Sequence, residues 1–570
     1  MQLKKASIAL LAAAALALSA CSTGGSNKGD GGDGGSDLPA SDYNKVDPAE
    51  LQDGGKLSLT IGAYPENWNR WHLDGNTVDL ASKIGSFVNP VNWIYDENGN
   101  FDVNPNYVES YTMNDKGDGE SAMILTMNLN PNAKWNSGTP ITYADYEATW
   151  KACSGQIEDV TCPSPDGWNE IESIEKGENE FQVVVKYNTV YPDWSANMSE
   201  IGPAEGLSDA ATFNEGWKDA VESAKYMAGP FIPTNSNTAQ GVLTLERNPN
   251  WWGPTPKLDT VTFSALEQEP AAAAFANSEI DALNFIVDAA SYETANKRQD
   301  VDIKMSSSVQ WRHFTFNSRA GVLQDKLVRQ GIQHAIDTAD IAASDLAGLP
   351  SAELNLHLGN HFFMPNQDGY VDNSVEFSEE LAKEKFEEAG YVMNESTGYY
   401  EKDGQELAFR YLRLPGNHAS ENEGAMLTEQ MQKVGVRVTY TDTEPKDFFT
   451  QIQNGEYEST SFAWQGTPYP MANVGQIYGK PLDDEGRQLN SNFTGLEVPE
   501  IDALIPQIAS ETDDAKRREL TNEADKLVWD NVMVLPLYYR ANITAIPSNL
   551  ANYGSTAFET LLVENIGYIK

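Results

Sequence analysis

Residues 311–341 read WRHFTFNSRAGVLQDKLVRQGIQHAIDTADI and predict a strand, a turn and an amphipathic helix in succession. Apolar and polar side chains alternate from Trp311 to Phe316, which is the period of two that is typical of a strand with one buried face. After the turn, apolar side chains recur at spacings of three and four residues, which places them on one face of a helix. Asp325 can cap the start of that helix, and Asp337 can cap a second one. The stretch therefore predicts an α/β unit.

The same residues carry a family resemblance. FTFN followed by D-x-x-V-R-Q-x-I-x-x-A-I-D resembles the segment with which family 5 extracytoplasmic solute-binding proteins begin their second lobe. Further strings resemble that family's motifs in the family's order: KWNSGTPITYADYEATW at 134–150, AGPF at 228–231, LERNPNWWG at 245–253, FANSEIDALNF at 275–285, LAKEKFEEAGY at 381–391 and VLPLYYR at 534–540. One departure is Ser278, where the family usually has glycine. The resemblance implies an α/β fold of the class II periplasmic-binding-protein type, with two lobes that contain mixed sheets, a hinge between them, and an extra subdomain in the first lobe.

The resemblance also implies a division of the chain. At 570 residues the chain is too long for one core, so several domains are expected. We expect a signal peptide at 1–20, a lipidated cysteine and flexible tether at 21–54, a first lobe at 55–311 with an inserted subdomain at about 80–200, a second lobe at 312–535, and a return to the first lobe at 536–570.

The N-terminus has the pattern of an export signal. Lys4 and Lys5 precede an apolar run that is too short to span a membrane as a mature helix. Leu18-Ser19-Ala20-Cys21 then resembles a lipobox, which implies that Cys21 becomes the lipid-bearing N-terminus and anchors the protein to a membrane. The alternative is an ordinary signal peptide followed by an incidental cysteine. The Gly, Ser, Asp and Asn residues that follow are typical of a flexible tether.

Charge excludes one class of partner. The chain has 84 acidic and 39 basic residues, for a formal charge of -45. Such a surface repels phosphate backbones, so we expect no nucleic-acid binding. An acidic surface keeps an exported protein soluble, and attraction of cationic ligands is the alternative interpretation.

The two remaining cysteines, Cys153 and Cys162, close a short loop in a chain with an export signal. This favours a disulfide over a metal site, which would need further ligands nearby.

Motifs for catalysis are missing from the sequence. It contains no G-x-S-x-G, no Gly-rich phosphate loop and no H-E-x-x-H. His357 and His361 have helical metal spacing, but the Gly and Pro around them predict a loop. We therefore expect a binding protein with no cofactor and no metal, and an extracellular hydrolase stays as an alternative.

The ligand contacts implied by the resemblance centre on residues 462–470, FAWQGTPYP. In peptide-binding members of the family, a Trp here is followed three residues later by an Asp that pairs with the peptide's N-terminal ammonium. Alignment on Trp464 places Thr467 at the Asp and Ser461 where those receptors carry an arginine. A hydroxyl cannot supply the charge-assisted bond that a buried ammonium requires. Recognition of a free N-terminus is therefore not expected unless another acid substitutes, the candidates being Asp442, Glu444 and Glu66.

Other predicted contacts come from the first loop, from the last crossover and from the opening strand. They are Trp68, Asn69, Tyr538, Trp311 and Asn317. The last two are expected to be chiefly structural.

The function implied is that of a lipid-anchored, extracytoplasmic substrate-binding protein at the bacterial cell membrane. It would be a monomer that captures a peptide or peptide-like solute between its lobes and delivers it to the permease and ATPase subunits of an ABC importer. Residues 359–370, GNHFFMPNQDGY, add a resemblance to an actinobacterial branch that includes mycobacterial LpqW-like lipoproteins. This second resemblance leaves open a regulatory envelope lipoprotein that binds a lipid or glycolipid without transport.

Overall fold

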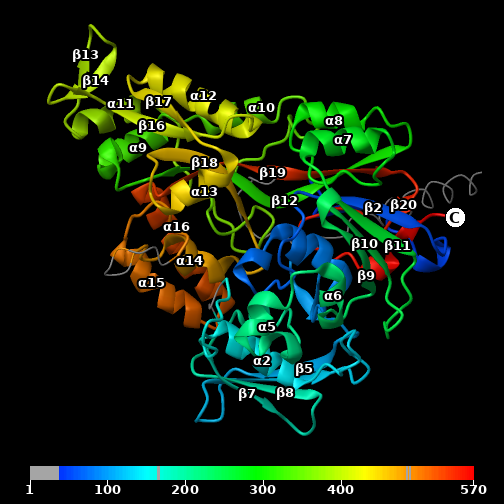
Figure 1. Cartoon of the computed structure of the whole chain (residues 1–570). Coiled ribbons are helices and arrows are strands. Elements are labelled where there is room, and N and C mark those ends of the chain that lie inside the picture. Colours follow the sequence, from blue (N-terminus) through cyan, green and yellow to red (C-terminus); the bar gives the residue numbers. More distant parts are fainter. Residues whose placement is uncertain (1–37, 164–166, 483–485, 487–489) are drawn as a thin grey trace, which may run out of the picture. The chain divides into compact units, whose positions relative to one another are not determined.

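The computed structural model describes residues 38–163, 167–482, 486 and 490–570 (Figure 1). They belong to one compact unit, Gly34–Lys570. The predicted signal peptide and Cys21 lie outside the described residues. Within the described ranges, no helix combines the length and the apolar character that a membrane crossing requires.

Residues 311–316 form the end of β12, which lies in a five-stranded mixed sheet with the strand order β17-β16-β18-β12-β19. β16 is parallel to β17 and β18, whereas β12 is antiparallel to β18 and β19. The strands are β12 (Val301–Phe316), β16 (Ala408–Arg413), β17 (Arg437–Asp442), β18 (Ser459–Gln465) and β19 (Val534–Pro547). Figure 1 shows β12 and β19 side by side, reaching from the other strands of this sheet toward β2 and β9–β11.

Helices of the same part of the chain accompany this sheet, and much of their apolar surface joins its hydrophobic cluster. They are α9 (Lys326–His334), α10 (Thr338–Asp345), α11 (Glu379–Glu388), α12 (His418–Lys433), α13 (Pro445–Gln453), α14 (Val474–Tyr478), α15 (Pro499–Ser510) and α16 (Asp514–Asn531). A small sheet contains β13 (Val392–Asn394), β14 (Tyr399–Lys402) and β15 (Gln405–Glu406).

A second sheet, with the order β2-β11-β10-β9, has its own hydrophobic cluster. Its strands are β2 (Lys56–Ile61), β9 (Phe231–Asn237), β10 (Val242–Arg247) and β11 (Thr260–Ala265). β2 runs parallel to β11, although some 200 residues separate them in the chain. The helices α1 (Gly85–Val88), α6 (Ala220–Ser223), α7 (Gln268–Ala276) and α8 (Ala289–Ala295) belong to the same part of the chain.

A third cluster is formed by an antiparallel sheet with the order β5-β6-β8-β7 and by α2 (Tyr143–Cys153). The strands are β5 (Val108–Asn114), β6 (Met123–Leu129), β7 (Ile171–Lys176) and β8 (Gln182–Tyr187), followed by α3 (Trp194–Asn197), α4 (Ala204–Leu207) and α5 (Ala210–Glu215). The sheet, α2 and α3 fall within the inserted subdomain predicted at about 80–200, whereas α4 and α5 follow it, and its boundaries stay a prediction.

Short strand pairs complete the described part of the fold, and one of them joins its two ends. β1 (Ser41–Tyr43) pairs with β21 (Gly554–Thr556), β20 (Leu550–Ala551) with β22 (Gly567–Tyr568), and β3 (Trp93–Tyr95) with β4 (Phe101–Val103). The two ends of the described chain therefore lie together.

The two predicted helix caps are confirmed. Asp325 accepts a hydrogen bond from the Leu327 N–H at the start of α9, and Asp337 accepts from Ala339 and Asp340 at the start of α10. Both helices begin where the short polar side chain replaces a missing backbone acceptor.

The prediction that only one face of residues 311–316 is buried is wrong, because all six residues are buried. β12 is an interior strand, and protein covers both of its faces. Polar Arg312 is tolerated there because Glu423 of α12 supplies a matching buried charge. The alternating pattern in the sequence therefore distinguishes a buried apolar face of the strand from a buried polar face, and not a buried face from an exposed one.

Residues 275–285, which carry part of the family resemblance, form the end of α7 and no strand. α7 is followed by Ser278 at a φ of 60°, the left-handed conformation that glycine takes without strain. This explains the family's preference for glycine at that position. Beyond it, Leu283 makes only an isolated bridge with Ala545 of β19.

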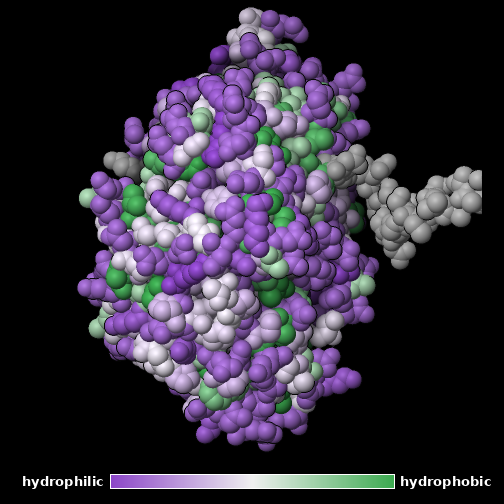
Figure 2. Space-filling model, turned by 90° about the vertical axis from the view of Figure 1, so that its right-hand side faces the viewer, coloured by the Kyte–Doolittle hydropathy of each residue, from purple (hydrophilic) through white to green (hydrophobic). Residues whose placement is uncertain are grey.

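The surface agrees with the acidic composition. On the face shown in Figure 2, hydrophilic residues predominate and hydrophobic ones are scattered in small groups.

Candidate ligand-binding cavity

A cavity of about 870 Å³ lies against the middle of the two long strands β12 and β19. Its wall also includes the end of β2, the start of α7 and parts of the C-terminal segment 553–566. Small-molecule sites commonly have volumes of roughly 300–1,000 Å³. The cavity is therefore large enough for a ligand and borders both the β2–β11 sheet and the five-stranded sheet.

The β12–β19 ladder is interrupted where it borders the cavity. The register shifts between Ser307 and Trp311, so residues 308–310 of β12 lie opposite the single residue Arg540 of β19. A bulge of this kind bends a strand and re-aims its side chains. Residues 308–310 and Arg540 all line the cavity.

Three of the charged side chains that line the cavity are stabilised by the protein itself, through an ion pair, a hydrogen bond or the dipole of a helix. Lys83 pairs with Asp79 at 2.7 Å. Although burial opposes it, the hydrogen bond and charge of Lys83 help to lower the pKa of Asp79. Glu559 accepts a hydrogen bond from the Tyr43 hydroxyl at 2.8 Å. Glu267 stands at the N-cap of α7, where the positive end of the helix dipole favours an acid.

Arg540 is placed differently. Its Nη1 donates to Oε1 of Gln310 at 2.6 Å, across the bulge. Among the residues that the structure describes, no carboxylate forms an ion pair with it. The cavity therefore presents a guanidinium whose hydrogen-bond partner is a neutral amide and not an acid.

The remaining polar wall consists mainly of neutral amides and hydroxyls, including Gln268, Asn284 and Gln465. The Nε2 atom of Gln268 is enclosed and has no hydrogen-bond partner among the described residues. Such groups can pair with the amide groups of a ligand.

A groove of about 720 Å³ adjoins the cavity, since Glu559, Thr560 and Leu561 line both. Its other walls come from residues 43–48 and from the β3–β4 hairpin. The two spaces together offer more room than one small molecule needs.

None of the seven predicted contact residues, all of which are described, lines the 870 Å³ cavity. Trp464 and Thr467 flank Gln465, which does line it. The ring of Trp464 lies nearly parallel to His313 and to Phe493, at interplanar angles of 13° and 11° and centroid distances of 5.9 Å. Trp464 is only partly buried, and its contact with a ligand stays a prediction.

Thr467 is also partly buried. Its carbonyl oxygen accepts from the Gln367 amide at 3.2 Å, and its hydroxyl accepts from the Tyr469 N–H at 3.1 Å. Contact of Thr467 with a ligand likewise stays a prediction.

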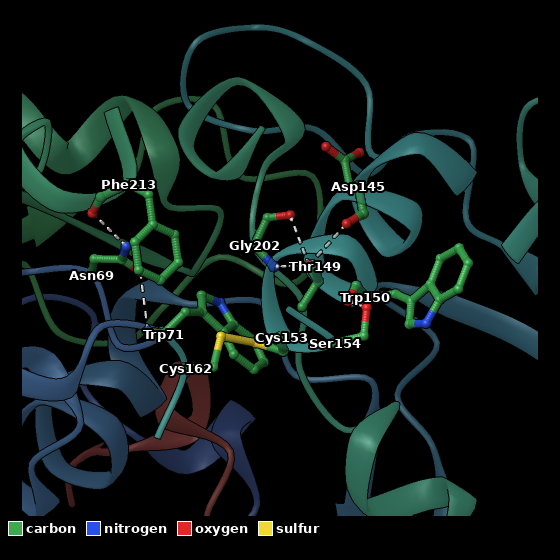
Figure 3. Close-up of a disulfide and its surroundings, with 10 residues drawn as sticks. All are labelled: Asn69, Trp71, Asp145, Thr149, Trp150, Cys153, Ser154, Cys162, Gly202 and Phe213. Atoms are coloured by element: carbon green, nitrogen blue, oxygen red, sulfur yellow. Dashed lines mark hydrogen bonds between the residues drawn. A yellow bond between two sulfur atoms is a disulfide. The ribbon is translucent and has the colours of Figure 1, made fainter. Parts of the chain in front are cut away.

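Trp68 and Asn69 are buried in the cluster around β2. The Asn69 side chain donates to the Phe213 carbonyl oxygen at 2.9 Å and accepts from the Trp71 N–H at 3.0 Å (Figure 3). These bonds hold the loop after β2 in place, so the pair serves packing in this structure.

Trp311 and Asn317 are likewise buried. The Asn317 amide donates to the carbonyl oxygens of Gly455 and Tyr457, at 3.0 and 2.8 Å, which ties the end of β12 to the start of β18. This structural role is the one that the sequence favours for them.

Ser461, the residue that replaces the receptors' arginine, is buried beside an arginine from another strand. Nη2 of Arg312 lies 3.1 Å from the Ser461 hydroxyl oxygen. Arg312 also forms a bidentate ion pair with Glu423, with Nε 2.7 Å from Oε1, and Ser461 donates to Glu423. The guanidinium missing at 461 is thus present nearby, but a buried carboxylate of the protein already occupies it.

Tyr538 belongs to the same polar network. Its hydroxyl donates to Asp345 at 2.8 Å, and the Asn422 amide donates to the other oxygen at 2.6 Å. Burial, reinforced by the charge of Glu423, raises the pKa of Asp345 to about 7. Tyr538 therefore orients a buried acid in this structure.

The three substitute acids do not line the cavity. Asp442 pairs with Arg413 at 2.8 Å, and Glu444 and Glu66 are exposed elsewhere. Glu267 and Glu559 are the acids that line it.

The predicted disulfide is confirmed. Cys153, the last residue of α2, is bonded to Cys162, and their Cα atoms lie 5.1 Å apart (Figure 3). The bond ties the end of α2 to the loop that follows it.

Within the described ranges, no cluster of three His, Cys, Asp or Glu side chains is arranged to hold a metal. His357 and His361 do lie in a loop, as predicted. His357 contacts Asp372 at 3.2 Å, and the two ring nitrogens of His361 face Asp525 and the Val534 carbonyl oxygen.

The sequence did not predict that Arg540 and Gln310 line a cavity. Arg540 ends the VLPLYYR motif, but nothing in the neighbouring sequence distinguishes an arginine that lines a cavity from one at the surface. The bulge that exposes both residues depends on the pairing of strands more than 200 residues apart.

Three comparisons bear on the identity of the chain. The family model described as bacterial extracellular solute-binding proteins, family 5 Middle, matches residues 102–484. The oligopeptide-binding protein OppA of Mycobacterium tuberculosis is 32% identical over 538 residues, which cover 93% of this chain and 87% of OppA.

Solved structures show the fold. The periplasmic EDTA-binding protein EppA superposes with a TM-score of 0.82 at 20% identity, covering 94% of this chain and 99% of EppA. The oligopeptide-binding protein AppA of Bacillus subtilis, solved in complex with a nonapeptide, gives 0.73 at 21% identity, covering 91% and 100%. The predicted two-lobed, periplasmic-binding-protein-like α/β fold is therefore confirmed. The finer resemblance to LpqW-like lipoproteins stays a prediction.

Proposed function

Because this chain belongs to family 5 of the bacterial extracellular solute-binding proteins, we propose that it is the lipid-anchored, solute-capturing subunit of an ABC importer. In this proposal it binds a peptide or peptide-like solute in the 870 Å³ cavity and delivers it to the permease and ATPase subunits. It acts by binding and carries out no chemistry on its ligand.

The observation that carries the proposal is the position of the cavity against β12 and β19, where its wall also includes the end of β2 and Gln465 of β18, so that it borders two sheets. A ligand held there contacts both sides of a hinge. It stabilises the closed form by the difference between its affinities for the closed and the open forms.

The choice of a peptide has two supports. OppA, the relative that is 32% identical over nearly the whole chain, is an oligopeptide-binding protein. The wall of amides such as Gln268 and Asn284 offers donors and acceptors to a peptide backbone, and the adjoining groove gives an extended chain room to continue.

The ligand can be identified by native mass spectrometry of the full chain, purified without added solute. We expect a mixture of peptides to remain bound, with masses that disappear after unfolding and refolding. A lipid or glycolipid in their place would contradict the peptide proposal and favour a regulatory lipoprotein.

The anchor is tested by Cys21→Ala in the producing cells. We expect the wild type in the membrane fraction and the variant released from it, because at least one acyl chain is lost. The matched control is the double variant Cys153→Ser and Cys162→Ser, which removes the disulfide and should stay with the membrane. Equal membrane association of Cys21→Ala and wild type would contradict lipid anchoring.

A further inference from the structure

We propose that Arg540 receives a carboxylate of the bound solute and that Gln310 positions it to do so. This inference rests on the proposed function and deepens it, since it assigns the chemical group by which the cavity selects its ligand.

The first support is the charge balance of the cavity. Of the charged residues that line it, Lys83 has Asp79 and Glu559 has the Tyr43 hydroxyl. Arg540 has a neutral amide and, among the described residues, no carboxylate.

The second support is the bulge. Residues 308–310 stand opposite Arg540 alone, so the ladder opens at this point and both partners line the cavity. The Gln310 oxygen engages Nη1 at 2.6 Å. No bond from Nε or Nη2 to another described residue accompanies it. The guanidinium is thus held at one corner while its other N–H groups remain for a ligand.

The third support is energetic. A partly enclosed guanidinium loses hydration, and one amide oxygen replaces only part of it. A carboxylate can accept two parallel N–H bonds from arginine, which are shorter and stronger than bonds between neutral groups. The group that best completes this site is therefore a carboxylate, such as the C-terminus or an acidic side chain of a peptide.

The sign of the charge also matters for selection. The chain as a whole is strongly acidic and repels anions at a distance, whereas the cavity contains an arginine that forms no ion pair with a described acid. A zwitterionic ligand with a localised carboxylate satisfies both, because its net charge is small and its anionic end fits Arg540.

The test compares two probes on the full chain. One is a library of random pentapeptides with free termini, and the other is the same library amidated at the C-terminus. Equilibrium dialysis with quantification by mass spectrometry gives the apparent affinity of each library. The variants are Arg540→Gln, Arg540→Lys and Gln310→Ala. The control is Arg413→Gln, a partly exposed arginine outside the cavity whose partner is Asp442.

We expect amidation to weaken binding to the wild type by roughly 10- to 100-fold, which is the range of a hydrogen bond to a charged group. Arg540→Gln should weaken the free-acid library by a similar factor and abolish the difference between the libraries. Arg540→Lys should restore part of it, since lysine keeps the charge but not the fork. Gln310→Ala should reduce the difference several-fold, and Arg413→Gln should match the wild type.

Two failures can be told apart. If the wild type binds both libraries equally, Arg540 does not select a carboxylate at the C-terminus, and the inference is overturned while peptide binding stands. If the wild type binds neither library, the proposed function fails and this inference fails with it. Should Arg540→Gln not fold, as judged by its thermal transition, the comparison of the two libraries on the wild type still decides.

Discussion

Arg312 and Arg540 lie on the paired strands β12 and β19 but in opposite settings. Arg312 is buried and forms a bidentate ion pair with Glu423, which is itself fully buried. Arg540 faces the cavity and has only the amide of Gln310. The comparison shows how the setting decides the role of the two arginines. Arg312 is structural because the fold supplies its counter-charge, whereas no described acid supplies one to Arg540, which leaves it available to a ligand.

Arg517 is an intermediate case. It forms a bidentate ion pair with Asp193, with Nη1 2.8 Å from Oδ1, and joins α16 to the start of α3. Both side chains are nearly buried, yet they also line a cavity of about 510 Å³. The Tyr95 and Tyr469 hydroxyls, 2.9 Å apart, make a second contact between the same two parts of the chain.

The largest effect is expected from Arg312→Gln. The variant leaves Glu423 buried without its counter-charge and beside Asp345, a second buried acid. Removing one partner of a buried pair typically costs about 3–5 kcal/mol. Chemical denaturation should show this loss in the free energy of unfolding. The double variant Arg312→Met with Glu423→Leu should recover much of it, and equal stability of Arg312→Gln and wild type would contradict a structural role.

The next effect concerns pH and the same network. The pKa of Asp345 is raised to about 7 by burial and by Glu423, whereas the unfolded carboxyl titrates near 3.8. The folded state therefore keeps a proton that the unfolded state releases. Its contribution to stability is complete below about pH 4 and is lost as the pH rises to about 7, with a maximal slope of about 1.4 kcal/mol per pH unit.

Asp345→Asn removes this titration and keeps the shape of the side chain. The free energy of unfolding, measured between pH 4 and 8, should therefore fall less steeply in the variant than in the wild type. Asp442→Asn, which changes an exposed acid, is the matched control. Parallel curves for Asp345→Asn and wild type would show that Asp345 is ionised throughout.

A smaller loss is expected from Arg517→Gln, about 1–3 kcal/mol. Water can reach Asp193 from the neighbouring cavity, so the stranded acid is rehydrated more readily than Glu423 is. Because the pair joins two parts of the chain, small-angle scattering of the ligand-free variant should also give a larger radius of gyration. A double-mutant cycle with Asp193→Asn measures the coupling, and a coupling near zero would contradict the ion pair.

The fold could be predicted because its signals are local. The alternation that begins at Trp311, the caps at Asp325 and Asp337 and the disulfide between Cys153 and Cys162 each depend on residues close in the chain. Where a partner comes from far away, prediction failed: the polar face of β12 is buried because α12 supplies Glu423, more than 100 residues later.

The site could be predicted less well for the same reason. Two of the residues expected to contact a ligand, Trp464 beside Gln465 and Trp311 beside Gln310, are sequence neighbours of the cavity wall, but none of the expected residues lines it. Which neighbour faces the cavity depends on the register of β12 against β19, and a shift of one residue exchanges the faces of a strand. The bulge at 308–310 changes that register, because three residues of β12 stand opposite Arg540 alone, and nothing in the sequence near Arg540 predicts it.

The smallest effect, and the sharpest contrast with Arg312, is expected for the stability of Arg540→Gln. The variant loses one hydrogen bond to a neutral amide at a partly exposed position and strands no acid, so the free energy of unfolding should change by no more than about 0.5–1 kcal/mol. Denaturation of the ligand-free protein measures it, with Gln310→Ala as the companion variant that breaks the same bond from the other side. A loss of several kcal/mol, as for Arg312→Gln, would mean that Arg540 holds the fold together. A small loss of stability would mean that the fold does not depend on the charge of Arg540. The charge is then available to bind a ligand.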